Sequence, residues 1–420
     1  MMRRAQAGLR RLTTTRGRLS LLFLTCPLAV LTGVSFPGTS VAEQAAVPAV
    51  PVLPGTAWFA ADQAAAWFGV VAAACVALAM RSLTGSRRRW PAAIATLAVL
   101  SVAVSDHLLL TPAMWQIVLL ASFAVLPPVA TLRWSMRLTI SIYLFSAASK
   151  IDVGFVEGIG QLLSGELLSA IGLSPNPRQK MASAAILPFG EIVAACLLAR
   201  RRTRRSGLVA ATSMHLGLLT VAWRLGHSWA VINWNLFFLL LLPIQFAGVS
   251  RSIRPSAGEG LPGVLRTALW GVLALPILEP FGLWDHWPSW SVYSARPATV
   301  IVRVAAATDI SPELLGPSEP FTDRRTFLLD RAVFTIADRP PYPQERYRLA
   351  LAAAYVDRFP SETPFEVVIR RPDRWRRGQR HATIERITVR EELAAVQDSF
   401  WLNGTATTPW RLPPRETDGG

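Results

Sequence analysis

Long runs of apolar residues, separated by short polar segments, dominate the first two thirds of the chain. Runs of this kind predict helices that cross a membrane. The pattern predicts nine spans, or eight if the first apolar run is a cleaved signal peptide. The nine are residues 20–36, 64–80, 91–105, 115–132, 138–149, 181–199, 207–223, 229–249 and 264–284.

After Asp285 the pattern changes, because charged residues become frequent and the apolar runs become short. Alternating apolar positions predict strands over 299–304, 365–370 and 382–389, the last two joined by a basic turn at Gly378. Residues 347–358 and 391–400 have the spacing of helices. We therefore expect a small α+β domain after an all-α membrane part.

These patterns divide the chain into seven segments. We predict a basic N-terminus with a signal anchor or signal peptide, a Pro/Ala-rich linker, three spans, a block of four further helices, a final span, the α+β domain and a disordered tail. In that order the segments are residues 1–42, 43–63, 64–132, 133–249, 250–284, 285–405 and 406–420.

Charge supports this division and orients it. The 420 residues carry a formal charge of +16, yet the part from Asp285 onward is nearly balanced, with 19 Arg against 18 acidic residues. The surplus therefore lies in short loops between apolar runs, 19 basic residues falling on one predicted side and four on the other. Basic loops face the cytoplasm, so we predict a multi-pass cell-membrane protein with its C-terminal domain outside the cytoplasm.

Composition agrees with a membrane protein and argues against two other classes. The mean hydropathy is +0.34, and 51% of residues are hydrophobic, which is high for a soluble domain. The basic residues between Arg370 and Arg380 would suit nucleic acid, but they lie in a near-neutral domain predicted outside the cytoplasm. We expect the bilayer and its anionic lipids as partners, and no nucleic acid.

The three cysteines give no sign of a metal or disulfide framework. Cys26, Cys75 and Cys196 lie in apolar runs, and no two form a CxxC pair. We expect buried, unpaired thiols and no metal site.

Glu191 and His215 are the first candidates for chemistry. Each lies eight residues from the cytoplasmic end of its predicted helix, about 12 Å deep, and the two helices are joined by a short loop. A carboxylate and an imidazole at equal depth could relay protons or hold a ligand. A hydrogen bond that only joins the helices is the alternative.

A second group of candidates is expected at the outer ends of neighbouring helices. A desolvated lysine beside carboxylate and imidazole could act as a base or bind an anionic head group. Charged side chains that extend to the membrane surface are the alternative. The group consists of Lys150, Asp152, Arg224, His227, Asn233 and Asn235.

Segments within 133–249 resemble the DoxX/MauE-like group of small membrane proteins. The resemblance rests on RLTISIYLFSAASKIDVGF from Arg137, on PFGE at 188–191, on the arginine loop at 200–205 and on Met214-His215. It implies a four-helix core with Lys150, Glu191 and His215 facing inward. It also implies a redox or cell-envelope process, with quinone or haem as candidate cofactors and a thioredoxin-like protein or cytochrome as candidate partner. The chain departs from MauE-like members in having no dithiol motif.

The stretch YLFSAASKIDVGFVEG, residues 143–158, also resembles the membrane part of vitamin K-dependent γ-carboxylases. Phe155 stands where that family has Trp. This resemblance implies an enzyme with Lys150 as its base. A structural or lipid-binding membrane protein is the third hypothesis.

Overall fold

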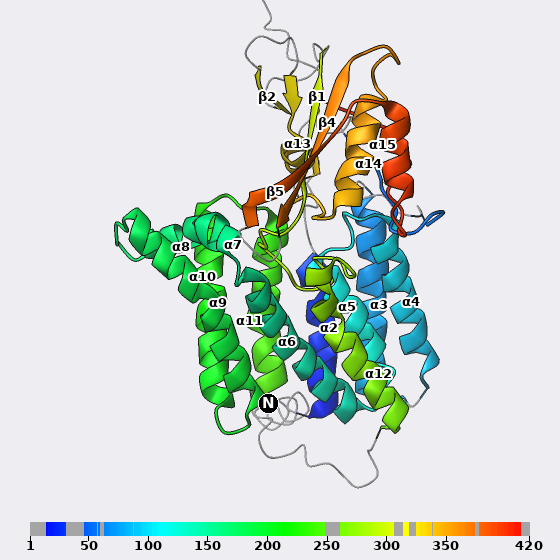
Figure 1. The fold of residues 1–420 in the computed structure, drawn as a ribbon. Helices are drawn as coiled ribbons and strands as arrows, with labels where there is room; N and C mark the ends of the chain where they lie inside the picture. Colours follow the sequence, from blue (N-terminus) through cyan, green and yellow to red (C-terminus); the bar gives the residue numbers. More distant parts are fainter. Residues whose placement is uncertain are drawn as a thin grey trace, which may run out of the picture. The chain divides into compact units, whose positions relative to one another are not determined.

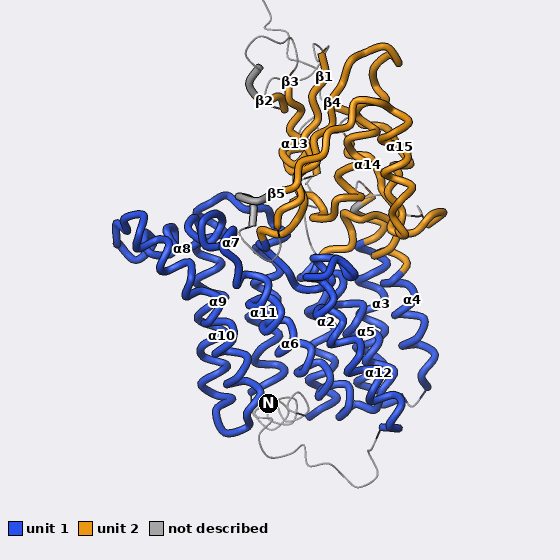
Figure 2. Tube along the Cα trace, viewed as in Figure 1, with its two compact units in different colours: residues 1–31, 68–100, 112–294 blue, residues 32–67, 101–111, 295–420 orange. Residues whose placement is uncertain are grey.

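A computed structural model gives the fold (Figure 1). The chain forms two compact units, which are coloured separately in Figure 2. Unit 1 comprises Met1–Leu31, Phe68–Leu100 and Pro112–Ser294, and unit 2 comprises Thr32–Trp67, Ser101–Thr111 and Ala295–Gly420. The structure describes residues 14–30, 46–56, 58, 63–86, 88–247, 261–305, 314–318, 325–337, 339–373 and 378–412.

Unit 1 is built from helices, although residues 64–67 and 101–105, at the ends of two of them, are assigned to unit 2. These elements are α2 (Thr15–Val30), α3 (Ala64–Thr84), α4 (Trp90–Ser105), α5 (Pro112–Phe123), α6 (Pro128–Lys150), α7 (Val153–Glu157), α8 (Ile159–Ala170), α9 (Pro177–Ala199), α10 (Arg204–Arg224), α11 (Trp229–Phe246), α12 (Gly263–Ala274) and the 3₁₀ helix η1 (Leu275–Phe281).

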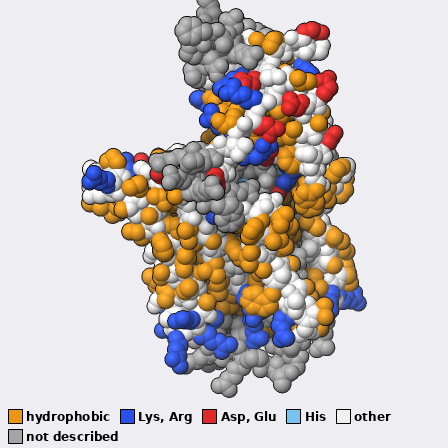
Figure 3. Space-filling model, viewed as in Figure 1, with side chains coloured by type: hydrophobic (Ala, Val, Ile, Leu, Met, Phe, Trp, Pro, Cys, Tyr) orange, Lys and Arg blue, Asp and Glu red, His pale blue; other side chains and the backbone are white. Residues whose placement is uncertain are grey.

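Several of these helices suit a lipid environment. Five helical segments in the described part of the chain are long and apolar enough to cross a membrane: Ala65–Thr84, Pro177–Ala199, Arg204–Arg224, Trp229–Phe246 and Gly263–Phe281. On the face drawn in Figure 3, hydrophobic side chains cover the helices of unit 1, and basic side chains collect at one end of them. The fold fits a multi-pass membrane protein. The count of eight or nine spans stays a prediction.

Four helices of unit 1 enclose a common interior. α6 packs against α9, α9 against α10, α10 against α11, and α11 against α6. The first described helix, α2, packs against α11, α6 and α5, and it buries Leu22, Phe23 and Cys26. The guanidinium of Arg18 donates to the carbonyl of Ala247, at the C-terminal end of α11, where helix carbonyls lack partners.

The break between the fourth and fifth predicted spans lies earlier than the sequence suggested. The prediction of spans over 115–132 and 138–149, with Arg133 and Arg137 in a loop, is wrong at this boundary. α5 ends at Phe123, and both arginines lie within α6. Pro128 occupies the first turn of α6, where its missing N–H costs nothing, so the prolines start a helix here. Two helices still result, so the alternation of directions is unchanged.

Within the described residues, unit 2 forms a five-stranded antiparallel sheet with three helices. The strand order is β2-β3-β1-β4-β5. Its strands are β1 (Thr299–Val304), β2 (Leu315–Ser318), β3 (Arg325–Phe327), β4 (Phe365–Asp373) and β5 (Gly378–Ile387). Its helices are α13 (Leu329–Ala337), α14 (Glu345–Val356) and α15 (Arg390–Asp398). The predicted α+β character is confirmed, and residues 374–377 of the predicted basic turn lie outside the described residues.

Described residues of the predicted linker and tail are held by hydrogen bonds in unit 2. Ala46 pairs with Arg411 in an isolated antiparallel bridge, and the amide of Asn403 donates to the carbonyl of Val52. Trp410 is 3% exposed, and its indole donates to the carbonyl of Leu351. Residues 46–52 of the predicted Pro/Ala-rich linker are therefore hydrogen-bonded within unit 2, and the prediction of a disordered tail is wrong for 406–412. Burial of apolar side chains explains both differences.

The cysteines follow the prediction only in part. Cys26 and Cys75 are buried, whereas Cys196 is exposed on α9. Cys196 lies in a segment apolar enough to cross a membrane, so this exposed thiol belongs to a surface suited to lipid. The prediction that all three thiols are buried is wrong for Cys196, because an apolar run does not reveal which face of its helix is covered.

Candidate functional site

A cavity of about 120 Å³ lies within unit 1. Its wall comes from α6, α9, α10 and α11, with further residues from α7, α8 and the segment after η1. Most lining side chains are apolar. Five of the polar residues singled out in the sequence also line it: Lys150, Glu191, His215, His227 and Asn235.

An ion pair between Lys150 and Glu191 joins α6 to α9 at this cavity. The Lys150 ammonium donates to Glu191 Oε1 over 2.7 Å, and the two side chains are 7% and 11% exposed. The ammonium also donates to Ser146 Oγ, one helical turn earlier on α6, over 2.6 Å. Each of these buried charges stabilises the other, because removing either one would leave the other without a counter-charge.

The second oxygen of Glu191 has no hydrogen-bond partner. Glu191 Oε2 is completely buried among the described residues, and no described donor reaches it. His227 Nε2, on the α10–α11 connection at the same cavity, is likewise buried without a partner. Buried polar atoms are nearly always paired with protein or with another molecule. Two unpaired atoms on residues that line one cavity therefore point to a ligand.

His215 is held between two other helices. His215 Nδ1 lies 2.8 Å from Asn235 Oδ1 on α11, and His215 Nε2 lies 2.7 Å from the hydroxyl of Tyr143 on α6. The Asn235 amide nitrogen donates to the carbonyl of Val231, which fixes its oxygen toward the imidazole. This network assigns the proton of a neutral imidazole to Nδ1, and Tyr143 then donates to Nε2.

Glu191 and His215 line one cavity but do not bond to each other. Glu191 pairs with Lys150, and His215 pairs with Tyr143 and Asn235. The predicted direct pair is therefore wrong. Position along a helix axis does not specify the direction in which a side chain leaves its helix.

Three of the predicted outer residues take no part in lining the cavity. Asp152 caps the N-terminus of α7 by accepting from the amide of Gly154 over 2.7 Å. Arg224 forms an ion pair with Glu166 over 3.1 Å, with both side chains substantially exposed. Asn233 is 7% exposed on α11. Asp152 and Arg224 therefore serve local structure, because helix ends need caps and exposed charges find partners.

The segment after η1 closes part of the cavity with a strained residue. Val292 and Tyr293 line the cavity, and Tyr293 has φ of 65°, in the left-handed region that non-glycine residues rarely adopt. Burial raises the pKa of Tyr293 to about 12 and lowers the pKa of His227 below its usual value. Both groups are therefore neutral near pH 7, and strained backbone is common where ligands are clamped.

Sequence reasoning missed Tyr143, Ser146 and Tyr293. Tyr143 and Ser146 precede Lys150 by seven and four residues, so all three share one face of α6. That spacing could have indicated that they belong to the site. No sequence pattern indicated Tyr293, because only the folded chain brings the segment after η1 back to the helices.

The geometry also tests the two candidate cofactors. Among the described residues, no group of three or more His, Cys, Asp and Glu could hold a metal ion. Both ring nitrogens of His215 are already hydrogen-bonded, and a cavity of about 120 Å³ is far too small for a haem. A single aromatic ring is the right size, since an engineered cavity of roughly 150 Å³ binds benzene.

Comparison with protein-family models, with curated proteins and with solved structures finds no match for this chain.

Proposed function

We propose that unit 1 binds the hydroxyl-bearing ring of a small membrane-soluble molecule, of which a quinol is the leading example. The observation that carries the proposal is the buried Glu191 Oε2 without a partner. A ligand hydroxyl would donate to this oxygen. Lys150 uses two of its three N–H groups, on Ser146 and Glu191, so its third can hold a ligand oxygen.

The size and polarity of the cavity support a quinol over other ligands. A single aromatic ring matches the cavity volume of about 120 Å³. The apolar faces of the ring would pack against lining side chains such as Phe155, Leu218 and Phe238. A quinol carries hydroxyls at opposite ends of its ring. A second hydroxyl would serve the unpaired His227 Nε2, which is neutral near pH 7 because burial lowers the pKa of this imidazole.

A quinol ligand links the cavity to a redox or cell-envelope process. The resemblance to DoxX/MauE-like proteins implies such a process, carried out with a thioredoxin-like or cytochrome partner. Both the family assignment and the partner are part of this proposal. In this view the protein holds a quinol while a cytochrome partner accepts its two electrons and two protons are released. With a thioredoxin-like partner the direction is reversed, because the partner's dithiol would give two electrons and two protons to the quinone form and become a disulfide.

Proton abstraction by Lys150, as in the γ-carboxylase resemblance, is the second candidate. Its specific support is the burial of Lys150 beside the cavity. A base must be a neutral amine with its lone pair free, whereas Lys150 forms an ion pair with Glu191 over 2.7 Å. Binding therefore explains the geometry better than base catalysis does. A purely structural role would leave Glu191 Oε2 unexplained.

The test uses the full-length chain in detergent and methylhydroquinone as a soluble quinol. Isothermal titration under argon should detect binding to the wild type. Leu218→Trp fills the cavity and should abolish it, whereas Leu216→Trp, at a 52% exposed position on the same helix, should not. Glu191→Gln should bind about tenfold more weakly or worse, because a hydrogen bond to a charged group is lost.

Toluene is the matched ligand, since it has the ring without the hydroxyls. It should bind at least about tenfold more weakly than methylhydroquinone. Equal binding of the two would show that the polar groups play no part. Unchanged methylhydroquinone binding by a folded Leu218→Trp protein would place the ligand elsewhere and end the proposal.

A further inference from the structure

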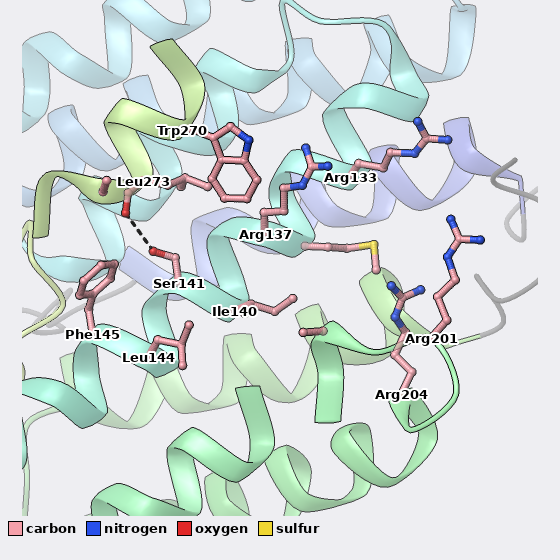
Figure 4. Close-up of a pocket in the computed structure, with 13 residues that line it drawn as sticks. Arg133, Arg137, Ile140, Ser141, Leu144, Phe145, Arg201, Arg204, Trp270 and Leu273 are labelled. Atoms are coloured by element: carbon pink, nitrogen blue, oxygen red, sulfur yellow. Dashed lines mark hydrogen bonds between the residues drawn. The ribbon is translucent and has the colours of Figure 1, made fainter. Parts of the chain in front are cut away.

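A second and larger pocket in unit 1 has one basic and one apolar end. Its volume is about 550 Å³. Arg133 and Arg137 reach it from α6, and Arg201 and Arg204 reach it from the α9–α10 turn and the start of α10. Figure 4 shows these four arginines gathered toward one end of the pocket, with Leu144 and Phe145 toward the other.

Three of the four arginines have no carboxylate partner in the described part of the chain. No described Asp or Glu lines the pocket. Among the described residues, Arg137, Arg201 and Arg204 have no carboxylate within ion-pair distance. Arg137 lies over the rings of Trp134 and Trp270 at 4.4 and 5.2 Å, and Arg204 donates to the carbonyl of Leu198. These contacts position the guanidinium groups but leave their charge unbalanced.

The two ends of the pocket are spaced like the parts of a lipid. Arg133 and Phe145 are separated by 12 residues of α6, about 18 Å along the helix axis. At the basic end, Arg204 is the first residue of α10, and Arg133 and Arg137 lie in the second and third turns of α6. The apolar end lies further along α6, beside Leu273 of α12. A phosphate at one end would leave acyl carbons along the other.

We propose that this pocket binds one anionic phospholipid, with its phosphate among the four arginines and an acyl chain along Leu144 and Phe145. Arginine binds phosphate oxygens through paired N–H groups. In a zwitterionic lipid the head group's own cation neutralises the phosphate charge, so such a lipid gains less from the arginines. Basic pockets between membrane helices recognise anionic head groups in this way. The site is separate from the quinol cavity, so either proposal can fail alone.

The test compares phosphatidylglycerol with phosphatidylcholine on the purified full-length chain. Native mass spectrometry in a neutral detergent should show one tightly held phosphatidylglycerol and no comparable phosphatidylcholine. Arg137→Gln with Arg201→Gln should weaken that binding by roughly 30-fold. Arg200→Gln with Arg202→Gln is the matched control, because both are exposed neighbours outside the pocket and remove the same charge.

Two further arms identify which part of the lipid is bound. Leu144→Trp fills the apolar end without changing charge and should also weaken phosphatidylglycerol binding. Glycerol 3-phosphate at millimolar concentration should displace the lipid poorly, because it has no acyl chain. Efficient displacement would indicate a site for free phosphate compounds, and equal losses in the two double variants would indicate surface charge alone. Either result would overturn the proposal, as would unchanged binding by a folded Arg137/Arg201 variant.

Discussion

At the scale of single residues, the most informative feature is a buried charge pair that leaves one oxygen unused. Lys150 and Glu191 come from positions 41 residues apart, on α6 and α9. Their burial is costly, since each charge loses its hydration. Replacing such a pair with apolar residues is often harmless to stability, so packing alone gives little reason to keep it. A ligand that needs Glu191 Oε2 supplies that reason.

A double-mutant cycle tests whether the two charges depend on each other. Glu191→Leu and Lys150→Leu should each destabilise unit 1 by about 3–5 kcal/mol, because each leaves an uncompensated buried charge. The double variant should recover most of that loss. Thermal unfolding in detergent measures all four proteins.

The exposed pair Arg224–Glu166 provides the control for this cycle. Its side chains are 45% and 30% exposed, so Glu166→Leu should cost less than about 1 kcal/mol. Additive losses at Lys150 and Glu191 would show that the pair is not coupled. A stable double variant that no longer binds methylhydroquinone would assign the pair to ligand binding, whereas retained binding would assign it to packing.

At the scale of elements, strands with a clear alternation of apolar positions were predicted from the sequence, and very short strands were not. β1 was predicted at its observed bounds, because six residues alternate in burial along it. β2 and β3 have four and three residues, too few for alternation to be recognised, and β2 contains Gly316 and Pro317. The α5–α6 break was displaced because proline can start a helix as readily as end one.

The residues of the candidate site were easier to predict than the contacts among them. Polar residues in apolar helices stand out individually, which is why Lys150, Glu191 and His215 could be named from sequence. Which of them touch depends on the rotation of each helix about its axis, and that is set by packing against neighbours. The cavity itself, and the approach of Tyr293, exist only in the folded chain.

In unit 2, one carboxylate connects three strands and gives a pH-dependent prediction. Glu366 on β4 accepts from Arg303 of β1 over 2.8 Å and from Arg386 of β5 over 3.0 Å. Burial opposes ionisation of this carboxyl, but the hydrogen bonds and charges of Arg303 and Arg386 outweigh it and lower the pKa of Glu366. The folded state therefore favours the ionised carboxylate more than the unfolded state does.

Glu366→Gln should destabilise the protein at pH 7 and have progressively less effect in acid. Because the folded pKa is below the unfolded value of about 4.3, stabilisation by Glu366 is complete above that value and is lost as pH falls through the folded pKa. Thermal unfolding of wild type and variant from pH 7 to 3 measures the convergence. Glu392→Gln, at an exposed site on α15, is the control and should show little difference. A gap between wild type and Glu366→Gln that persists at pH 3 would refute the ionic explanation.

At the scale of the whole molecule, the chain combines an apolar helical unit with a charged α+β unit. Unit 2 takes up residues 46–56 and the loop after α4 as well as the C-terminal part. His107 in that loop accepts from Arg346 over 3.1 Å and lies 2.7 Å from the carbonyl of Val50. Three distant parts of the sequence thus meet in one soluble-type core, so all three should lie on the same side of the membrane.

Membrane orientation is the last prediction, and it follows from loop charge. The turn after α9 carries the densest basic run, Arg200, Arg201 and Arg202 followed closely by Arg204 and Arg205. Such loops remain in the cytoplasm, and three predicted spans separate this turn from unit 2, which should therefore lie outside. Alkaline phosphatase, active only outside the cytoplasm, should be active when fused after Gly420 and inactive when fused after Arg202. A β-galactosidase series at the same points should give the opposite pattern. Activity of alkaline phosphatase at Arg202 alone would invert the predicted topology, and activity at both points would mean that the number of spans between them is wrong.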